Sequence, residues 1–226
     1  LPMDYLRRIW GSASLRKRIL FTLFIILVFR IAAHITVPGI DPASITAFFS
    51  QNQASVILSA LTGGGMENFS IVLMGLAPYI NASIIVQLMT VVIPKLEQYK
   101  NEGESGQKKI SSLTRWLTVP LALAQSYGMI ILISGTPGVQ GFLDPTNPAD
   151  VLPAMITIAA GTIFLVWLGE LITEKGIGNG ISLLIFTGIV SAMPGIFGRL
   201  FNEAALGVSA KMAPFVAFVL VTVALL

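Results

Sequence analysis

Very few side chains in this 226-residue sequence could do covalent or metal chemistry. The chain has no cysteine and a single histidine, His34, so it offers no thiol nucleophile, no disulfide and no cysteine-based metal site. The glycine-rich stretch GIGNG, residues 176–180, lacks the Walker lysine and the glycine spacing of a dinucleotide-binding motif. We therefore expect no catalytic residue, no metal site and no cofactor, and interpret GIGNG as a turn whose glycines adopt left-handed conformations.

The polar residues that need an explanation lie in the apolar stretch GLAPYINASIIVQLM, residues 75–89. On a helix, 100° per residue places two of them, Ser83 and Gln87, on one narrow face together with the apolar residues Leu76 and Ile80. Ile85 points the opposite way. Pro78 fits the first turn of such a helix, where its missing N–H breaks no bond, and this indicates a span that starts after a break.

Two interpretations of the polar residues Asn81, Ser83 and Gln87 stand on periodicity alone. They could form hydrogen bonds to neighbouring spans, or they could line an aqueous pathway, because polar groups at membrane depth avoid lipid. Glu170, Glu174 and Lys175 are expected at a membrane boundary, solvated or paired.

The composition places the chain among membrane proteins. Apolar residues make up 54% of it and charged residues only 11%, so a soluble globular domain is excluded. A bilayer core about 30 Å thick needs roughly 20 apolar helical residues. Runs of that length predict spans over residues 19–37, 75–94, 113–134, 151–172 and 181–198, and a sixth that begins near Lys211. The expected fold class is all-α, a polytopic membrane helical bundle.

Basic residues gather on one side of the predicted bundle, whereas residues 38–74 and 135–150 contain none. Because basic loops stay in the cytoplasm, we expect a cytoplasmic amino-terminal segment, 1–18. The helical bundle follows over 19–198, and an outer loop with the start of the sixth span covers 199–226. A cleaved signal peptide is disfavoured because the first apolar run contains Arg30 and His34.

A shorter apolar piece at residues 56–69 is too short to cross a bilayer and too apolar for a solvated loop. This pattern is typical of a re-entrant element, with the glycines at 63–65 as a hinge. A segment that lies flat on the membrane interface is the alternative.

Four stretches together resemble one family. SIVLMGLAPYINASIIVQLM (70–89) and WLGELITEKGIGNGISLLIF (167–186) are similar to the two signatures of the SecY protein-translocation channel family, and its bacterial branch fits best. YKNEGESGQKKIS (99–111) and FRIAAHITVPGID (29–41) resemble its first large cytoplasmic loop and the end of its first helix. The resemblance implies the amino-terminal half of a ten-span channel built from two inverted halves.

The resemblance also implies three sets of functional residues. An aliphatic ring that closes the pore matches Leu76, Ile80, Ile181 and Ile185. The plug, a half-helix in the outer funnel, matches Val56, Ile57, Leu58, Leu61, Gly63, Gly64, Gly65 and Phe69. Near the lateral gate, the seam that opens toward lipid, the candidates are Asn81, Ser83, Gln87, Thr90 and Gln125. A narrow apolar ring holds no stable water column and so blocks ions.

The function implied is that of a non-enzymatic, central pore-forming subunit of the general secretory translocase in the inner (cytoplasmic) membrane. It would conduct unfolded pre-proteins and release membrane segments sideways into lipid. Implied partners are the SecE and SecG subunits, the SecA motor or the ribosome, signal sequences and membrane lipid, without nucleic-acid readout. The alternative is a small-solute secondary transporter. The spans lack the buried charges expected for ion coupling, with Arg30 as the main exception.

Overall fold

The structure is a computed structural model that describes residues 12–38, 40, 69–135 and 143–205. Within these ranges the regular structure is helical, and the one extended pairing is the isolated antiparallel bridge between Thr36 and Ser70. The expected all-α fold class is therefore confirmed for the described chain. The sixth predicted span and all of the predicted plug except Phe69 lie outside the described residues.

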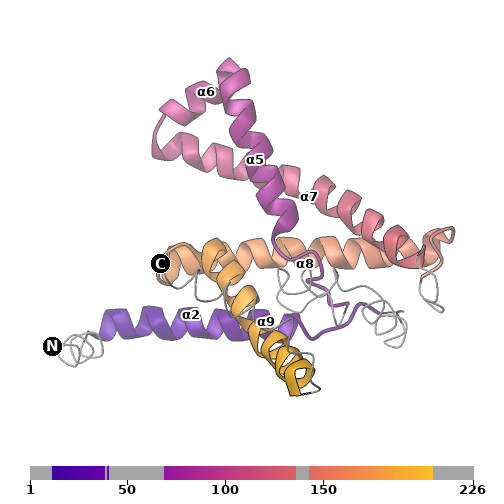
Figure 1. Cartoon of the computed structure of the whole chain (residues 1–226). Helices are drawn as coiled ribbons and strands as arrows, with labels where there is room; N and C mark the ends of the chain where they lie inside the picture. The colour runs from indigo at the N-terminus through magenta and orange to yellow at the C-terminus, as the bar shows by residue number, and fades with distance from the viewer. Residues whose placement is uncertain (1–11, 39, 41–68, 136–142, 206–226) are drawn as a thin grey trace.

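Six helices make up the described chain (Figure 1). In chain order they are α2 (Ala13–Ala32), α5 (Ala77–Val92), α6 (Pro94–Asn101), α7 (Glu104–Ser134), α8 (Pro148–Lys175) and α9 (Gly180–Ala205). Helix α8 is central, because it contacts α2, α5, α7 and α9. Its buried residues cover about half of the helix circumference, and the exposed half is apolar as well, with Leu152, Ile156 and Trp167, which is typical of a membrane helix that packs on one side and meets lipid on the other.

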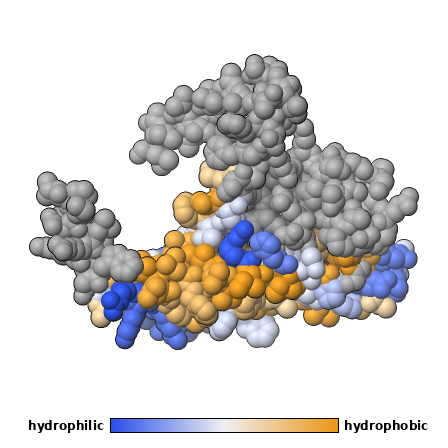
Figure 2. Space-filling view, turned by 90° about the horizontal axis from the view of Figure 1, so that it is seen from below, coloured by the Kyte–Doolittle hydropathy of each residue, from blue (hydrophilic) through white to orange (hydrophobic). Residues whose placement is uncertain are grey.

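Two described helices, α7 and α8, are each long and apolar enough to cross a membrane. The 28 residues of α8 extend about 42 Å, more than a bilayer core of about 30 Å needs. A third crossing is formed by α5 and α6 if they are taken together, although the chain bends by 103° between them. Figure 2 shows a broad hydrophobic surface with hydrophilic side chains at its two ends and a smaller hydrophilic patch between them. Such a broad hydrophobic surface is expected for a membrane protein.

The buried apolar side chains form two clusters. The first, here called the loop-side cluster, contains Val37, Phe69, Leu73, Ile130, Ile133, Leu143, Val151, Ala154 and Ile158. The second, here called the central cluster, contains Ile25, Phe29, Ala32, Ala33, Val72, Leu76, Leu165, Val166, Leu168, Ile172 and Leu184. Residues 69–76 contribute to both, so this short segment ties the two clusters together.

The first two helices differ from the predicted spans at both ends, since α2 begins at Ala13 rather than at residue 19 and α5 begins at Ala77 rather than at residue 75. Helix α2 stops at Ala32 rather than near residue 37, because the following residues pair with the chain before α5 instead of continuing the helix. Helix α5 stops at Val92, since Pro94 forces the preceding Ile93 into an extended conformation (φ −103°, ψ 110°). The proline then starts α6 at its first position, where a missing N–H costs nothing.

Helix α7 begins at Glu104, well before the predicted residue 113. Its additional turns are polar and are stabilised by ion pairs: Lys108 Nζ lies 2.9 Å from Glu104, and Lys109 Nζ lies 2.8 Å from Glu102. These charges extend the helix beyond its apolar part. At the opposite end, Asn147 caps α8 by accepting the N–H of Ala149 (3.1 Å).

The interrupted segment 69–76 holds the fold together through backbone contacts. Val37 N–H donates to the Phe69 carbonyl (3.0 Å), and Ile71 N–H donates to the Ile35 carbonyl (2.9 Å). The other side of the segment lies directly on α8, because a Cβ added to Gly161 would overlap the Ile71 carbonyl oxygen. A glycine is therefore required at this point of α8 for the backbone of another segment to approach.

We predict that Gly161→Ala lowers the stability of the complete protein by about 1–3 kcal/mol, because backbone atoms of residue 71 cannot rotate away as a side chain could. The measurement is the thermal unfolding of the purified protein in detergent. Gly128→Ala is the matched control, since a Cβ there meets no atom within 4 Å. Equal melting temperatures for the two variants would contradict the close approach of α8 and residue 71.

Candidate functional site

The candidate site is built on the side of α5 that faces away from α7. This side, here called the free face, carries Leu76, Ile80, Ser83 and Gln87. Pro78 lies in the first turn of α5, as the sequence predicts, whereas Gly75 adopts a left-handed conformation (φ +54°) and Leu76 precedes the helix, which the sequence did not indicate. Ile80 N–H donates to the Leu76 carbonyl (3.0 Å), which places Leu76 and Ile80 one turn apart on the same face. The break before α5 thus sets the direction of this aliphatic row.

The opposite face of α5 is used for packing against α7. Its buried residues, Pro78, Ala82, Val86 and Thr90, recur every fourth position. The facing helix repeats the pattern with Thr114, Thr118, Ala122, Ser126 and Ile130. Small residues at the contact let membrane helices approach closely. The hydroxyls of Thr118 and Ser126 donate to carbonyls of their own helix, so close packing rather than interhelical hydrogen bonding joins the pair.

Three of the four predicted ring residues gather at one place. Leu76, Ile181 and Ile185 all belong to or pack on the central cluster. Leu76 and Ile185 also line the same small cavity of about 20 Å³, together with Leu184. Ile80 is separate from both clusters and is 38% exposed, one turn further along α5. The described structure therefore gives an aliphatic row from α5 beside a second one from α9.

The turn between α8 and α9 fixes where the second row begins. Gly178 has the predicted left-handed conformation (φ +70°), whereas Gly176 (φ −98°) does not and Gly180 already belongs to α9, so one glycine of GIGNG makes the turn. Thr173 Oγ1 accepts the N–H of Gly180 (2.9 Å), and Asn179 Oδ1 accepts the N–H of Ser182 (3.2 Å) at the start of α9. The first of these bonds connects α8 to α9, and the second caps the start of α9.

Close packing of α9 on α8 sets the position of Ile181. A Cβ added to Gly180 would overlap the carbonyl oxygen of Gly169 on α8, and one added to Gly169 would lie 2.6 Å from Ile181 Cδ1. Gly180 is needed for this approach, because a Cβ there would meet backbone atoms, whereas a Cβ at Gly169 would only displace the flexible end of the Ile181 side chain. The Ile181 side chain therefore rests on α8 at the base of the α9 row, a contact that the sequence did not indicate.

The predicted gate residues are divided between two faces. Gln87 Nε2 donates to Ser83 Oγ (3.2 Å) on the free side of α5, which confirms that these two residues share a face. Thr90 is buried in the packing face toward α7, and its hydroxyl donates to the Gln87 carbonyl (2.6 Å). Asn81 is exposed and Gln125 is half-buried on α7; neither forms a side-chain hydrogen bond to another described residue.

The one predicted plug residue that the structure describes is firmly anchored. Phe69 is buried in the loop-side cluster, and its carbonyl accepts the N–H of Val37. Its backbone is left-handed (φ +42°), unusual for a bulky residue. Phe69 thus marks a fixed end of the predicted plug segment.

Arg30, near the end of α2, faces the protein. Its Nη1 donates to Ser191 Oγ on α9 (2.8 Å), so the charge joins two helices. His34, one turn later, is exposed and bonds through Nδ1 to the Arg30 carbonyl (2.8 Å). Within the described chain, no group of three or more histidine, aspartate or glutamate side chains could hold a metal ion.

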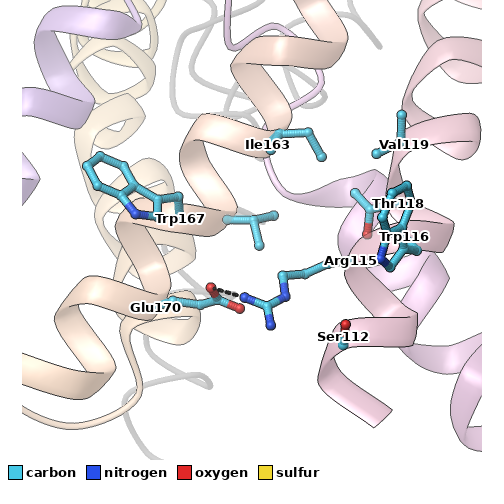
Figure 3. A pocket seen from close by; sticks show the side chains of 9 residues that line it. Ser112, Arg115, Trp116, Thr118, Val119, Ile163, Trp167 and Glu170 are labelled. Carbon is cyan, nitrogen blue, oxygen red and sulfur yellow. Dashed lines mark hydrogen bonds and ion pairs between the residues drawn. The ribbon is translucent and has the colours of Figure 1, made fainter. Parts of the chain in front are cut away.

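An ion pair that the sequence analysis did not identify joins α7 to α8. Arg115 Nη1 lies 2.9 Å from Glu170 Oε2 (Figure 3). Glu170 was expected to be solvated or paired at a membrane boundary, and it is paired. Its partner was not indicated, because the two residues lie 55 positions apart.

These features define a class. The described chain is a polytopic helical membrane protein in which an interrupted span presents an apolar row and polar groups on the side of α5 that faces away from α7. Interrupted helices of this kind are typical of membrane transport proteins, where irregular backbone is enclosed by protein.

Comparison with known proteins identifies the family. The SecY family model matches residues 70–226. The protein translocase subunit SecY of Pseudomonas aeruginosa is 46% identical over 199 residues, which cover 87% of this chain and 44% of that protein. The subunit of Escherichia coli K12 is 42% identical over 207 residues, with 91% and 47% covered. The chain belongs to the SecY family, and it spans about half the length of these relatives.

Solved structures agree on the fold. The chain is similar to Sec61 in a canine ribosome–channel complex from the endoplasmic reticulum, with a TM-score of 0.57 and 18% identity, over 87% of this chain and 43% of that one. It is also similar to a protein-conducting channel with a TM-score of 0.56 and 19% identity, over the same shares. The chain therefore shares its helical arrangement with these two structures although fewer than one residue in five is identical.

Proposed function

We propose that this chain is the amino-terminal half of the central pore-forming subunit of a secretory translocase, a non-enzymatic conduit for unfolded pre-proteins. The observation that carries the proposal is the pair of aliphatic rows, Leu76 with Ile80 on α5 and Ile181 with Ile185 on α9. Family membership and the curated names of its relatives support it.

The aliphatic rows provide a mechanism for closure. A narrow constriction of branched side chains excludes a continuous water column, so ions do not pass at rest. Aliphatic side chains have no directed bonds to break, and they can part around a polypeptide. The rest of such a ring would come from residues beyond the two described rows.

The free face of α5 continues into the proposed lateral gate. Ser83 and Gln87, already bonded to each other, and Gln125 on α7 would hold this seam closed through polar contacts that an apolar signal helix replaces. Because α5 and α7 are joined by their packing faces, they would move as one side of the gate. In this proposal the segment that ends at the anchored Phe69 serves as the plug.

We place the amino terminus in the cytoplasm and the chain in the inner (cytoplasmic) membrane. The basic residues of α6 and of the first turns of α7 support this orientation, since basic loops are retained inside. The SecA motor or the ribosome would dock on this cytoplasmic face, chiefly through loops of the carboxy-terminal half of the channel, and would supply the energy. SecE and SecG would complete the complex.

A small-solute transporter is the second candidate, and the polar contacts of two charged residues argue against it. Arg30 donates to Ser191, and Glu170 is paired with Arg115. These two charges, which could have served ion coupling, therefore already have protein partners. Counter-transport of an ion by the complete purified protein without polypeptide would favour the transporter.

Photo-crosslinking tests the conduit directly. A stalled secretory chain is expected to be captured by a photo-crosslinker at Ile80 and not by one at Ile85 in the complete protein, because the two side chains point to different sides of α5. The control is well matched, since both residues are 38% exposed in the described chain. Equal capture at the two positions, or no capture at Ile80 while secretion continues, would refute the proposal.

The gate proposal makes a separate prediction. Replacing Gln87 and Gln125 together with leucine removes polar contacts from the seam, so pre-proteins with weakened signal sequences should be exported more efficiently. Export is measured with a matched set of intact and weakened signals. Gln98→Leu on the exposed α6 is the control, and unchanged signal selectivity in the double variant would exclude a role for these residues at the seam.

A further inference from the structure

Helices α7 and α8 separate along their length and leave a pocket between them. Near the connection that joins the two helices, their side chains pack directly: Ile130 and Ile133 of α7 lie in one cluster with Val151 and Ala154 of α8. Toward the other end a cavity of about 420 Å³ opens between the helices. This volume is within the range of pockets that bury small ligands.

The pocket has the lining of a lipid-chain site. Val119, Ile163 and Val166 supply branched apolar side chains from both helices. Trp116 and Trp167 stand at opposite sides of the opening and are 75% and 53% exposed (Figure 3). Tryptophan rings are enriched at the level of lipid headgroups, so the two rings mark the depth of this opening in the membrane.

The Arg115–Glu170 ion pair lies at the same opening. The contact joins one guanidinium nitrogen of Arg115 to one carboxylate oxygen of Glu170 at 2.9 Å, and the two side chains remain 48% and 30% exposed. The guanidinium has five N–H donors and the carboxylate has two oxygens, so each group keeps capacity for a further partner. Opposite charges are thus held side by side at the opening of an apolar pocket.

We propose that this pocket binds one phospholipid with an ethanolamine headgroup. The phosphate would accept hydrogen bonds from the Arg115 guanidinium, and the primary ammonium would donate to the free oxygen of Glu170. An acyl chain would lie against Val119, Ile163 and Val166. The ligand's own two charges are adjacent, and they match the adjacent charges of the pair.

The charge pattern selects among lipids. The pair has no net charge, so it gives a purely anionic headgroup no advantage from the carboxylate side. A choline headgroup carries the same charges as ethanolamine but has no N–H to donate to Glu170. A charge-assisted hydrogen bond should therefore favour ethanolamine over choline by about tenfold.

The inference requires only that the chain lies in a membrane, and it is independent of whether polypeptides pass through the protein. Lipid binding can be measured without any translocation. Failure of the lipid site would leave the conduit proposal untouched, and failure of the conduit would leave the lipid site untouched.

The test is native mass spectrometry of the complete protein in mild detergent, titrated with ethanolamine or choline phospholipids that have the same acyl chains. We expect one site with about tenfold tighter binding of the ethanolamine lipid. In Arg115→Gln/Glu170→Gln this preference should disappear. Glu104→Gln/Lys108→Gln is the matched control, because it removes an exposed ion pair of the same helix outside the pocket and should leave the preference unchanged.

A further variant distinguishes loss of the lipid site from a general folding defect. Ile163→Phe fills the pocket and leaves the ion pair in place, so it should abolish tight binding of both lipids. Equal affinity for the two lipids in the unmodified protein would overturn the proposal, and so would a preference that survives Arg115→Gln/Glu170→Gln. Capture of a polypeptide instead of lipid by a photo-crosslinker at position 163 in native membranes would assign the pocket to a partner helix and would also overturn it.

Discussion

Backbone polar groups inside a bilayer have to find partners within the protein, and the interrupted segment before α5 depends on this constraint. Helix α5 has 16 residues and extends about 24 Å, less than a bilayer core, so the chain needs further residues at that level. Residues 69–71 meet the constraint by pairing with residues 35–37, and Gly161 lets their backbone lie directly on α8. Both apolar clusters then form around this segment.

The break before α5 explains how this helix can both pack against α7 and carry the candidate site. One face of α5 packs against α7 through residues that recur every fourth position. The aliphatic row and the Ser83–Gln87 pair therefore lie on the other side. The GIGNG turn and the paired glycines 169 and 180 place the second row on α9 against the same cluster. A rigid frame around α8 thus carries the two faces that we propose to move apart.

The sequence predicts the features that depend on local rules. Composition gives the membrane class, Pro78 gives the start of α5, and Gly178 gives the turn, because each follows from hydropathy or from one residue's backbone preference. The resemblance to the SecY family, which comparison with known proteins confirms, comes from local motifs as well. The ends of α2 and α5 could not be predicted from hydropathy. Both apolar runs continue past the helix ends, but α2 stops where the chain pairs with residues 69–71, and α5 stops at the bend at Ile93.

Contacts between distant segments could not be predicted. Nothing near Arg115 in the sequence indicates that it pairs with Glu170. Nothing near Gly161 indicates that the Ile71 carbonyl occupies the position where a Cβ would lie. The separation of Thr90 from the free-face residues Ser83 and Gln87 is of the same kind, because it depends on which side of α5 meets α7. Such pairings follow from tertiary packing, which a single sequence does not reveal.

The central claim is that the aliphatic row on the free face of α5 is the barrier to ions in the resting protein. Its most direct test is the ion leak of proteoliposomes that contain the complete complex with Ile80→Asn, compared with Ile85→Asn. The account predicts a raised leak for Ile80→Asn alone, since a polar side chain would let water fill the constriction. A leak that is unchanged in Ile80→Asn, or equally raised in both variants, would contradict it.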